Sequence, residues 1–211
     1  KMIDTVIFDF DGTLADTNKL ILNSFNHIYN KYHDRKCDED YILSTFGEPL
    51  ELTLRRDFSD YNYEEVVGCY RGYQVDKFDK EVTLYDTVIE TIKYLHNKDI
   101  KIGIATSRLK SSTLYVLKRF NLEKYFQVVI SSDDVVKHKP DKEPLIKAIQ
   151  GLNSTTENTL YVGDSKFDME CAINAEVTPV LVGWQKHSNE LAEKYNIKHV
   201  LNKMWDLTKI L

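Results

Sequence analysis

Residues 5–13 read TVIFDFDGT, an apolar run followed at once by two aspartates, Asp9 and Asp11. The run from Thr5 to Phe10 is short and rich in β-branched and aromatic residues, which is typical of a buried strand in a parallel sheet. The Asp-Gly pair that follows could form a hairpin turn. Helix-like sequence comes next instead of a partner strand, so this stretch is predicted to be a strand that ends in an acidic loop.

Similar apolar runs recur along the rest of the chain, and amphipathic segments separate them. The further predicted strands are Ile100–Ala105, Gln127–Ile130, Thr159–Val162 and Pro179–Val182. The predicted helices between and after them are Val88–Leu95, Leu114–Phe120, Pro144–Ile149, Phe167–Ile173 and Glu190–Tyr195. Strands that alternate with helices predict an α/β fold with a doubly wound parallel sheet.

One long interval interrupts this alternation, because no second strand is convincing until Ile100. Helical spacing first places Leu20, Ile21, Ser24, Phe25, Ile28 and Tyr32 on one stripe. A charged loop is expected at 34–40, and helix-like sequence returns at 49–58 and 64–78. A long helical connection would also fit, but the length favours a separate lobe. We expect a helical cap at 16–82, inserted into an α/β core made of 1–15 and 83–211.

Composition and charge limit the classes of function. The chain has 211 residues, with 33 acidic and 28 basic side chains and a net charge of -5. A mildly acidic protein is a poor candidate for nucleic-acid binding through a basic field. No stretch approaches the ~20 apolar residues of a membrane span, and the N-terminal apolar run is too short for a signal peptide. With three widely spaced cysteines, Cys37, Cys69 and Cys171, a reducing cytoplasm is expected.

Acidic residues follow two of the predicted strands. Asp9 and Asp11 end the first, and Asp164 follows Thr159–Val162. If these strands are neighbours, the three carboxylates form an oxygen-lined pocket of the kind that Mg²⁺ prefers. Ser165 and Asp168 have the spacing of a helix capping box, which explains Asp168 but not Asp164.

Two other segments could contribute polar groups to the same edge of the sheet. Thr106 and Ser107 follow the strand at Ile100–Ala105, where hydroxyl and backbone N–H groups can bind an anion. The alternative is that Ser107 only caps the next helix. Lys139 lies in a charged loop and could be solvated, but beside several carboxylates and a phosphate its charge becomes useful.

Together these segments resemble a known family. DFDGT at 9–13, Thr106, Lys139-Pro140 and GDSKFD at 163–168 look like the four motifs of the haloacid dehalogenase superfamily, in the same order and over nearly the whole chain. Within it, the segments TNKLILNSFNHIYNKY, FGEPL, SSDDVVKHKPDKEPL and NKMWDLTKIL resemble the bacterial pyrophosphatase branch of the phosphoglycolate phosphatase group.

The resemblance implies a Mg²⁺-dependent phosphohydrolase that acts on pyrophosphate or a small phosphomonoester such as phosphoglycolate. Asp9 would be the nucleophile that forms an aspartyl-phosphate, and Asp11 the general acid and then base. Thr106 and Lys139 would hold phosphate oxygens. Mg²⁺ would be bound by Asp9, the carbonyl oxygen of Asp11, Asp164 and Asp168, the last directly or through water. The physical logic agrees, because a cation removes the repulsion between a carboxylate and a phosphate dianion.

Substrate contacts are expected from both parts of the chain. In the core, the resemblance implies contacts from Thr106 and Lys139, and Gly12 and Ser107 are candidates beside them. In the cap, Gly47 and Arg71 are candidates. Phe46–Pro49 is a candidate because the family places this loop over the active site. Arg55 and Arg56 are further candidates, although most charges on a helical lobe face water. Lys142, Asp86 and Glu176 depart from the family pattern, outside the chemical core.

Several alternatives stay open. A sugar phosphomutase could use the same core, and a phospho-accepting signalling or binding module without turnover belongs to a different class. A dehalogenase is disfavoured because halide leaves without an acid such as Asp11 or a metal. The partner is expected to be a small phosphorylated substrate, with neither nucleic acid nor membrane, and the chain to be a monomer or homodimer.

Overall fold

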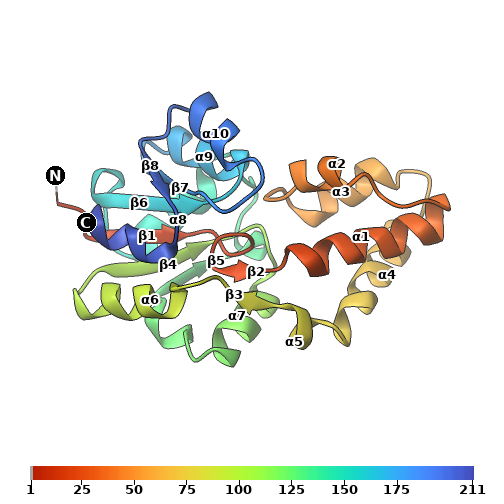
Figure 1. Ribbon diagram of the computed structural model, residues 1–211, viewed down its shortest axis with the longest axis horizontal. Helices are drawn as coiled ribbons and strands as arrows, with labels where there is room; N and C mark the ends of the chain where they lie inside the picture. The colour runs from red at the N-terminus through yellow and green to blue at the C-terminus, as the bar shows by residue number, and fades with distance from the viewer. Residues whose placement is uncertain (1) are drawn as a thin grey trace.

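Strand β1 (Thr5–Phe8) lies inside a six-stranded sheet in the computed structural model, which describes residues 2–211. The other strands of the sheet are β4 (Lys101–Ala105), β5 (Val128–Ile130), β6 (Thr159–Gly163), β7 (Thr178–Val182) and β8 (His199–Leu201). Their order is β5-β4-β1-β6-β7-β8, and every neighbouring pair is parallel (Figure 1). This arrangement confirms the predicted α/β fold with a doubly wound sheet.

Helices cover both faces of the sheet because the side chains of β1 alternate between the two faces. Val6 and Phe8 belong to an apolar cluster with α6 (Val88–Asn97) and α7 (Lys110–Arg119). Ile7 belongs to a second cluster with α8 (Glu143–Gly151) and α9 (Lys166–Asn174). A shorter helix, α10 (Ser188–Lys194), contacts β7. All four residues of β1 are buried, which explains why this strand reads as a continuous apolar run.

The register of the central strands decides where their loops meet. Phe8 is opposite Ile104 of β4 and Val162 of β6, so the three strands end at the same edge of the sheet. Beyond β1, the backbone N–H of Asp9 still donates to the carbonyl of Val162 at 2.8 Å. The loops that start with Asp9, Thr106 and Asp164 therefore lie next to one another, as expected if the first and fourth predicted strands are neighbours.

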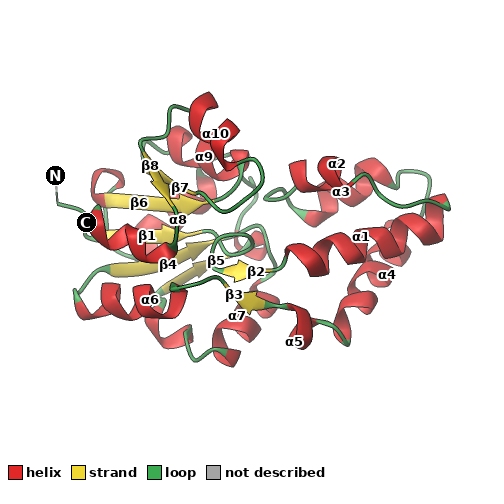
Figure 2. Cartoon of the chain, viewed as in Figure 1, coloured by secondary structure: helices red, strands yellow, loops and turns green. Residues whose placement is uncertain are grey.

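The helical insertion forms a lobe beside the sheet (Figures 1 and 2). Its helices are α1 (Asn18–His33), α2 (Glu39–Ser44), α3 (Leu50–Asp57), α4 (Tyr63–Val75) and α5 (Phe78–Glu81). The predicted stripe on α1 packs inward, with Phe25 and Ile28 in an apolar cluster that also contains Leu54 and Tyr70. This cluster is separate from the two that cover the sheet, which supports our proposal that the lobe is a cap.

The connections between cap and core contain two strands that the sequence analysis missed. β2 (Ala15–Asp16) and β3 (Thr83–Leu84) pair in antiparallel fashion where the chain leaves the core and returns to it. A strand of two residues is too short to show a period in its hydrophobic pattern. The edge strand β8 was also missed, because its three residues give no readable pattern.

Several predicted boundaries were wrong. The helix predicted from Leu114 begins at Lys110, and the helix predicted at 64–78 ends at Val75. β1 ends at Phe8 instead of Phe10. The charged loop at 34–40 is shorter than expected, because Asp38 accepts a hydrogen bond from the backbone N–H of Tyr41 at 3.1 Å and so begins α2. Short 3₁₀ segments complete the chain at Glu123–Tyr125, Ser132–Asp134, Thr156–Asn158 and Met204–Lys209.

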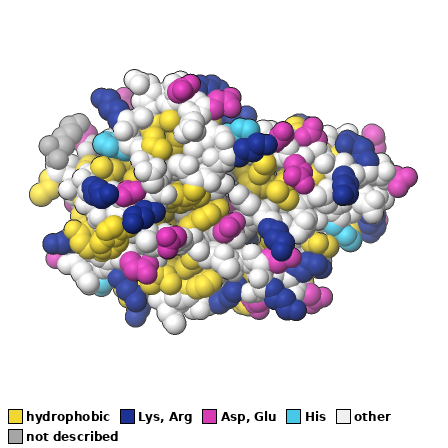
Figure 3. All heavy atoms as spheres, viewed as in Figure 1, with side chains coloured by type: hydrophobic (Ala, Val, Ile, Leu, Met, Phe, Trp, Pro, Cys, Tyr) yellow, Lys and Arg dark blue, Asp and Glu magenta, His cyan; other side chains and the backbone are white. Residues whose placement is uncertain are grey.

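The surface carries charges of both signs. On the face in Figure 3, basic and acidic side chains are interspersed over core and cap. Across residues 2–211, no helix is both long and apolar enough to cross a membrane.

Candidate active site

Asp9 and Lys139 form a buried ion pair at the edge of the sheet where β1 ends. The ammonium of Lys139 lies 3.0 Å from Oδ1 of Asp9 and 2.7 Å from Oδ1 of Asp168. It also donates to the hydroxyl of Tyr161 at 3.2 Å. Lys139 is 3% exposed, so the possibility that it is a solvated loop lysine is wrong.

Asp164 and Asp168 complete a group of carboxylates around this pair. Asp9, Asp164 and Asp168 each offer one oxygen, and these oxygens lie within 4.8 Å of one another. Asp164 follows β6 and accepts from the hydroxyl of Thr13 at 3.1 Å. Asp168 is fully buried. Its Oδ2 accepts from the hydroxyl of Ser165 at 3.0 Å, and the Ser165–Asp168 capping box is present.

Without a further cation, the negative charges of this carboxylate group are incompletely compensated, and the pKa values of its members shift. Burial, and then the charge of Asp168, raise the pKa of Asp9 to about 8. Burial, and then the charges of Asp168 and Asp9, raise the pKa of Asp164 well above its usual range. Burial also acts to raise the pKa of Asp168, but Lys139 outweighs it and the pKa is lowered. One lysine thus compensates three carboxylates incompletely.

This excess of negative charge fits a divalent cation. When all three aspartates are ionised, Lys139 leaves two negative charges uncompensated, and like charges this close repel unless a cation or protons lie between them. Carboxylate oxygens are the ligands that Mg²⁺ prefers. The oxygens of Asp9 and Asp164 are the better placed for direct contact, because both oxygens of Asp168 already accept hydrogen bonds from Lys139 and Ser165.

The carboxylate of Asp11 does not join the pocket that the sequence analysis predicted for Asp9, Asp11 and Asp164. Strand β1 ends at Phe8, and Asp11 lies in the loop that follows it. Its Oδ1 accepts from Nη2 of Arg108 at 2.7 Å and from the hydroxyl of Thr17 at 2.6 Å. Its carboxylate therefore lies outside the group formed by Asp9, Asp164 and Asp168, and its carbonyl oxygen remains the proposed metal ligand.

Arg108 is the residue of this site that the sequence analysis missed. It follows Thr106 and Ser107, and its Nε donates to Oδ2 of Asp11 at 3.0 Å. Burial acts to raise the pKa of Asp11, but the guanidinium of Arg108 outweighs it and lowers the pKa. No local sequence pattern indicates this role, because Asp11 and Arg108 are 97 positions apart.

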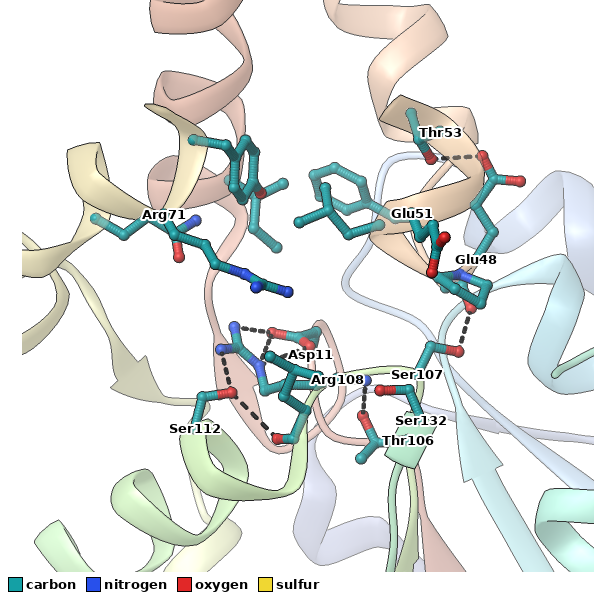
Figure 4. Close-up of a pocket in the computed structure, with 18 of the residues that line it drawn as sticks. Asp11, Glu48, Glu51, Thr53, Arg71, Thr106, Ser107, Arg108, Ser112 and Ser132 are labelled. Carbon is teal, nitrogen blue, oxygen red and sulfur yellow. Dashed lines mark hydrogen bonds and ion pairs between the residues drawn. The ribbon is translucent and has the colours of Figure 1, made fainter. Parts of the chain in front are cut away.

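Thr106 and Ser107 lie where β4 ends, and neither caps the following helix. The hydroxyl of Thr106 accepts from the backbone N–H of Arg108 at 3.1 Å, which fixes the turn. Ser107 donates to the carbonyl of Gly47 at 2.7 Å and so connects core to cap (Figure 4). The first turn of α7 begins after Leu109 without a side-chain cap, so the capping alternative for Ser107 is wrong.

Glycines allow two loops to approach this site closely. Gly12 has a φ of 77°, and a Cβ there would come within 2.3 Å of Oδ2 of Asp164. Its carbonyl accepts from Nε1 of Trp184 at 3.2 Å and from Nε2 of Gln185 at 2.8 Å. Gly47 has a φ of 98°, and a Cβ there would meet Oγ of Ser165 at 2.4 Å.

A cavity of about 650 Å³ lies between core and cap, and it contains most of the predicted site residues in its wall (Figure 4). The core contributes Asp9, Asp11, Thr106, Ser107 and Arg108, and the cap contributes Phe46–Pro49 and Arg71. The other cap arginines do not line it. Arg55 pairs with Glu51 at 2.7 Å, and Arg56 pairs with Glu48 at 2.7 Å.

The family is decided by a comparison with known proteins. Residues 6–182 match the family model described as "Haloacid dehalogenase-like hydrolase". The chain belongs to this family. The resemblance inferred from the motifs is thereby confirmed, and the chain is an enzyme of the hydrolase class.

Relatives of this haloacid dehalogenase-like hydrolase cover its whole length. It is 38% identical over 209 residues to "Pyrophosphatase PpaX" of Bacillus mycoides, covering 99% of this chain and 97% of the relative. It is 37% identical to "Putative pyrophosphatase PpaX" of Caldanaerobacter subterraneus subsp. tengcongensis, covering 99% and 94%. A solved "Putative haloacid dehalogenase-like hydrolase" from Bacteroides fragilis superposes with a TM-score of 0.86 at 25% identity, covering 97% and 99% of the two chains.

Proposed function

We propose that this hydrolase is a Mg²⁺-dependent phosphatase that forms an aspartyl-phosphate on Asp9 and acts on pyrophosphate or a small phosphomonoester such as phosphoglycolate. The observation that carries the proposal is the position of Asp9. Asp9 lines the cavity, and its carboxylate contacts Lys139 and belongs to a group of three buried carboxylates. A nucleophile that attacks a phosphate dianion needs such a cationic environment.

In the first half of the reaction, a carboxylate oxygen of Asp9 forms a bond to phosphorus while the bond from phosphorus to the leaving oxygen breaks. The protonated form of Asp11 donates its proton to that leaving oxygen. Thr106 and Lys139 hold the phosphoryl oxygens. Covalent catalysis divides one difficult displacement into two easier ones, and general acid catalysis contributes typically ~10²–10⁴-fold.

In the second half, a water molecule attacks the phosphorus of the aspartyl-phosphate. Asp11 accepts a proton from that water, and the carboxylate of Asp9 leaves. Phosphate is released and both aspartates return to their starting forms.

Mg²⁺ would be held by Asp9, Asp164 and the carbonyl oxygen of Asp11. Asp168 would contact it directly or through water. When bound, it supplies positive charge that offsets the repulsion between the carboxylates and the phosphate. Gly12, Ser107, Gly47 and Arg71 would complete the contacts to the substrate.

The names of the relatives support pyrophosphate as the first substrate to test. Two relatives at 37% and 38% identity over the full chain are named as pyrophosphatases. The cavity is lined by both cap and core, so its walls can contact a small substrate on opposite sides.

We expect the purified protein to release phosphate from pyrophosphate or phosphoglycolate when Mg²⁺ is present. Chelation of the metal should abolish this release, and restoring Mg²⁺ should recover it. The measurement is phosphate release, together with product analysis for a hexose 1-phosphate. An isomerised sugar phosphate without net phosphate release would favour a mutase, and a stable aspartyl-phosphate without turnover would favour a signalling module.

Mg²⁺ should also stabilise the fold, since it binds a site that the unfolded chain lacks. At a free concentration ~100-fold above Kd, we expect the midpoint of thermal unfolding to rise by about 5–10 °C. Asp164→Asn should lose most of this rise. Asp133→Asn is the matched control, because Asp133 lines the cavity but lies outside the carboxylate group. An equal rise in the wild type and in Asp164→Asn would contradict the proposed metal site.

A further inference from the structure

Arg108 presents a guanidinium to the cavity in a fixed position. Its side chain is 11% exposed, and the guanidinium lies over the rings of Phe10 and Phe78, at 5.8 and 5.5 Å from their centroids. Nη1 donates to the hydroxyl of Ser112 at 3.2 Å. These contacts hold the side chain from several directions, so little conformational entropy remains to be lost when it binds a ligand.

The pairing of Arg108 with Asp11 conflicts with the chemistry proposed for Asp11. Nε and Nη2 of Arg108 occupy both carboxylate oxygens, and Thr17 adds a further hydrogen bond to Oδ1. To donate a proton, Asp11 must first carry one, and a protonated carboxyl group no longer forms an ion pair with the guanidinium. The ion pair therefore has to open during the reaction, and a buried guanidinium without an anion would be costly. Arg108 then needs a replacement anion.

A second arginine extends into the same cavity from the opposite wall. Arg71 belongs to α4 of the cap, and its guanidinium points toward Asp11 and Arg108 (Figure 4). Lys139 contacts Asp9 and Asp168, and the proposed function assigns it to the phosphoryl group that is transferred. An anion in the space between cap and core would thus meet guanidinium groups from both sides, and guanidinium groups bind phosphate and carboxylate in bidentate fashion.

We propose that Arg108, together with Arg71, binds a second anionic group of the substrate, next to the phosphoryl group that is transferred. The replacement anion is then the substrate itself, and its arrival frees Asp11. The substrate class is a small phosphate compound with a further phosphate or carboxylate, rather than a phosphomonoester with a neutral remainder. This inference rests on the proposed function and specifies its substrate.

The kinetic test compares substrates that differ in the second anion. Phosphoglycolate and ethyl phosphate have similar size, but only the former carries a carboxylate. We expect Arg108→Gln to lower kcat/KM for pyrophosphate and phosphoglycolate by about 10²–10³-fold, the usual cost of an unpaired buried charge, and to change ethyl phosphate less than about 10-fold. Arg71→Gln should also lower kcat/KM for pyrophosphate and phosphoglycolate more than for ethyl phosphate. Arg35→Gln is the control, because Arg35 does not line the cavity.

A binding measurement separates this inference from the proposed function. Calorimetry with methylenediphosphonate and methylphosphonate requires no turnover, so it remains informative if no substrate is hydrolysed. The wild type should bind the diphosphonate more tightly, and Arg108→Gln should lose that preference. A wild type without the preference, or a variant that keeps it, would overturn the inference. An equal loss of activity on all substrates in both arginine variants would also overturn it.

Discussion

Replacing Asp9 by asparagine is expected to reduce phosphate release by at least about 10⁴-fold, as loss of a nucleophile commonly does. The amide has nearly the same shape as the carboxylate but is a much poorer nucleophile, and it cannot form the aspartyl-phosphate. The measurement is phosphate release from pyrophosphate in the presence of Mg²⁺. Mass spectrometry of the wild type after a short reaction should find the phosphoryl group on Asp9.

The fold should survive this substitution, because Lys139 keeps Asp168 and Tyr161 as partners. Thermal unfolding of the variant checks that expectation. Asp79→Asn is a matched control, since Asp79 lines the cavity but is largely exposed and pairs with Arg119 at 3.8 Å. Activity close to wild type in Asp9→Asn would show that another group attacks phosphorus.

The sequence was sufficient for the core because its signals there are local and repeated. The apolar runs and their polar ends predicted the parallel sheet, and the register of β1 with β6 brought Asp9 and Asp164 together as expected. The Ser165–Asp168 capping box was readable for the same reason, since its two residues interact across one turn of helix.

Interactions between distant segments could not be read in this way. The burial of Arg108 depends on Asp11 and on Phe78, a cap residue far away in sequence. The side chain of Asp11 is directed by the end of β1 at Phe8 and by the positive φ of Gly12. Neither feature can be predicted from the two-residue spacing between Asp9 and Asp11. An arginine after a strand is usually solvated, so only the packed structure identifies this one as part of the site.

Departures from the family pattern illustrate the difference between backbone and side chain. Glu176 stands where the family commonly has glycine, and its φ of 57° lies in the left-handed region that favours glycine. The turn after α9 therefore keeps the left-handed backbone conformation without a glycine, at the cost of some strain. The change concerns a turn and leaves the carboxylate group untouched.

Replacing Lys139 by methionine is expected to destabilise the metal-free protein by about 3–5 kcal/mol, the cost of leaving buried charges unpaired. Methionine has similar length but no charge, so Asp9 and Asp168 would lose the cation that lies 3.0 and 2.7 Å from them. Urea unfolding with a chelator present measures this loss. Phosphate release should fall by about 10²–10³-fold, because a charged donor to the phosphoryl oxygens is removed.

Lys137→Met tests whether charge alone explains the effect. Lys137 lies two positions earlier in the same loop and is exposed, so its loss should change stability by no more than about 0.5 kcal/mol. A small effect of Lys139→Met in the chelated protein would mean that Asp9 and Asp168 tolerate burial without the ammonium. The three carboxylates would then have to share protons in the metal-free state, and Lys139 would matter for phosphate binding more than for the fold.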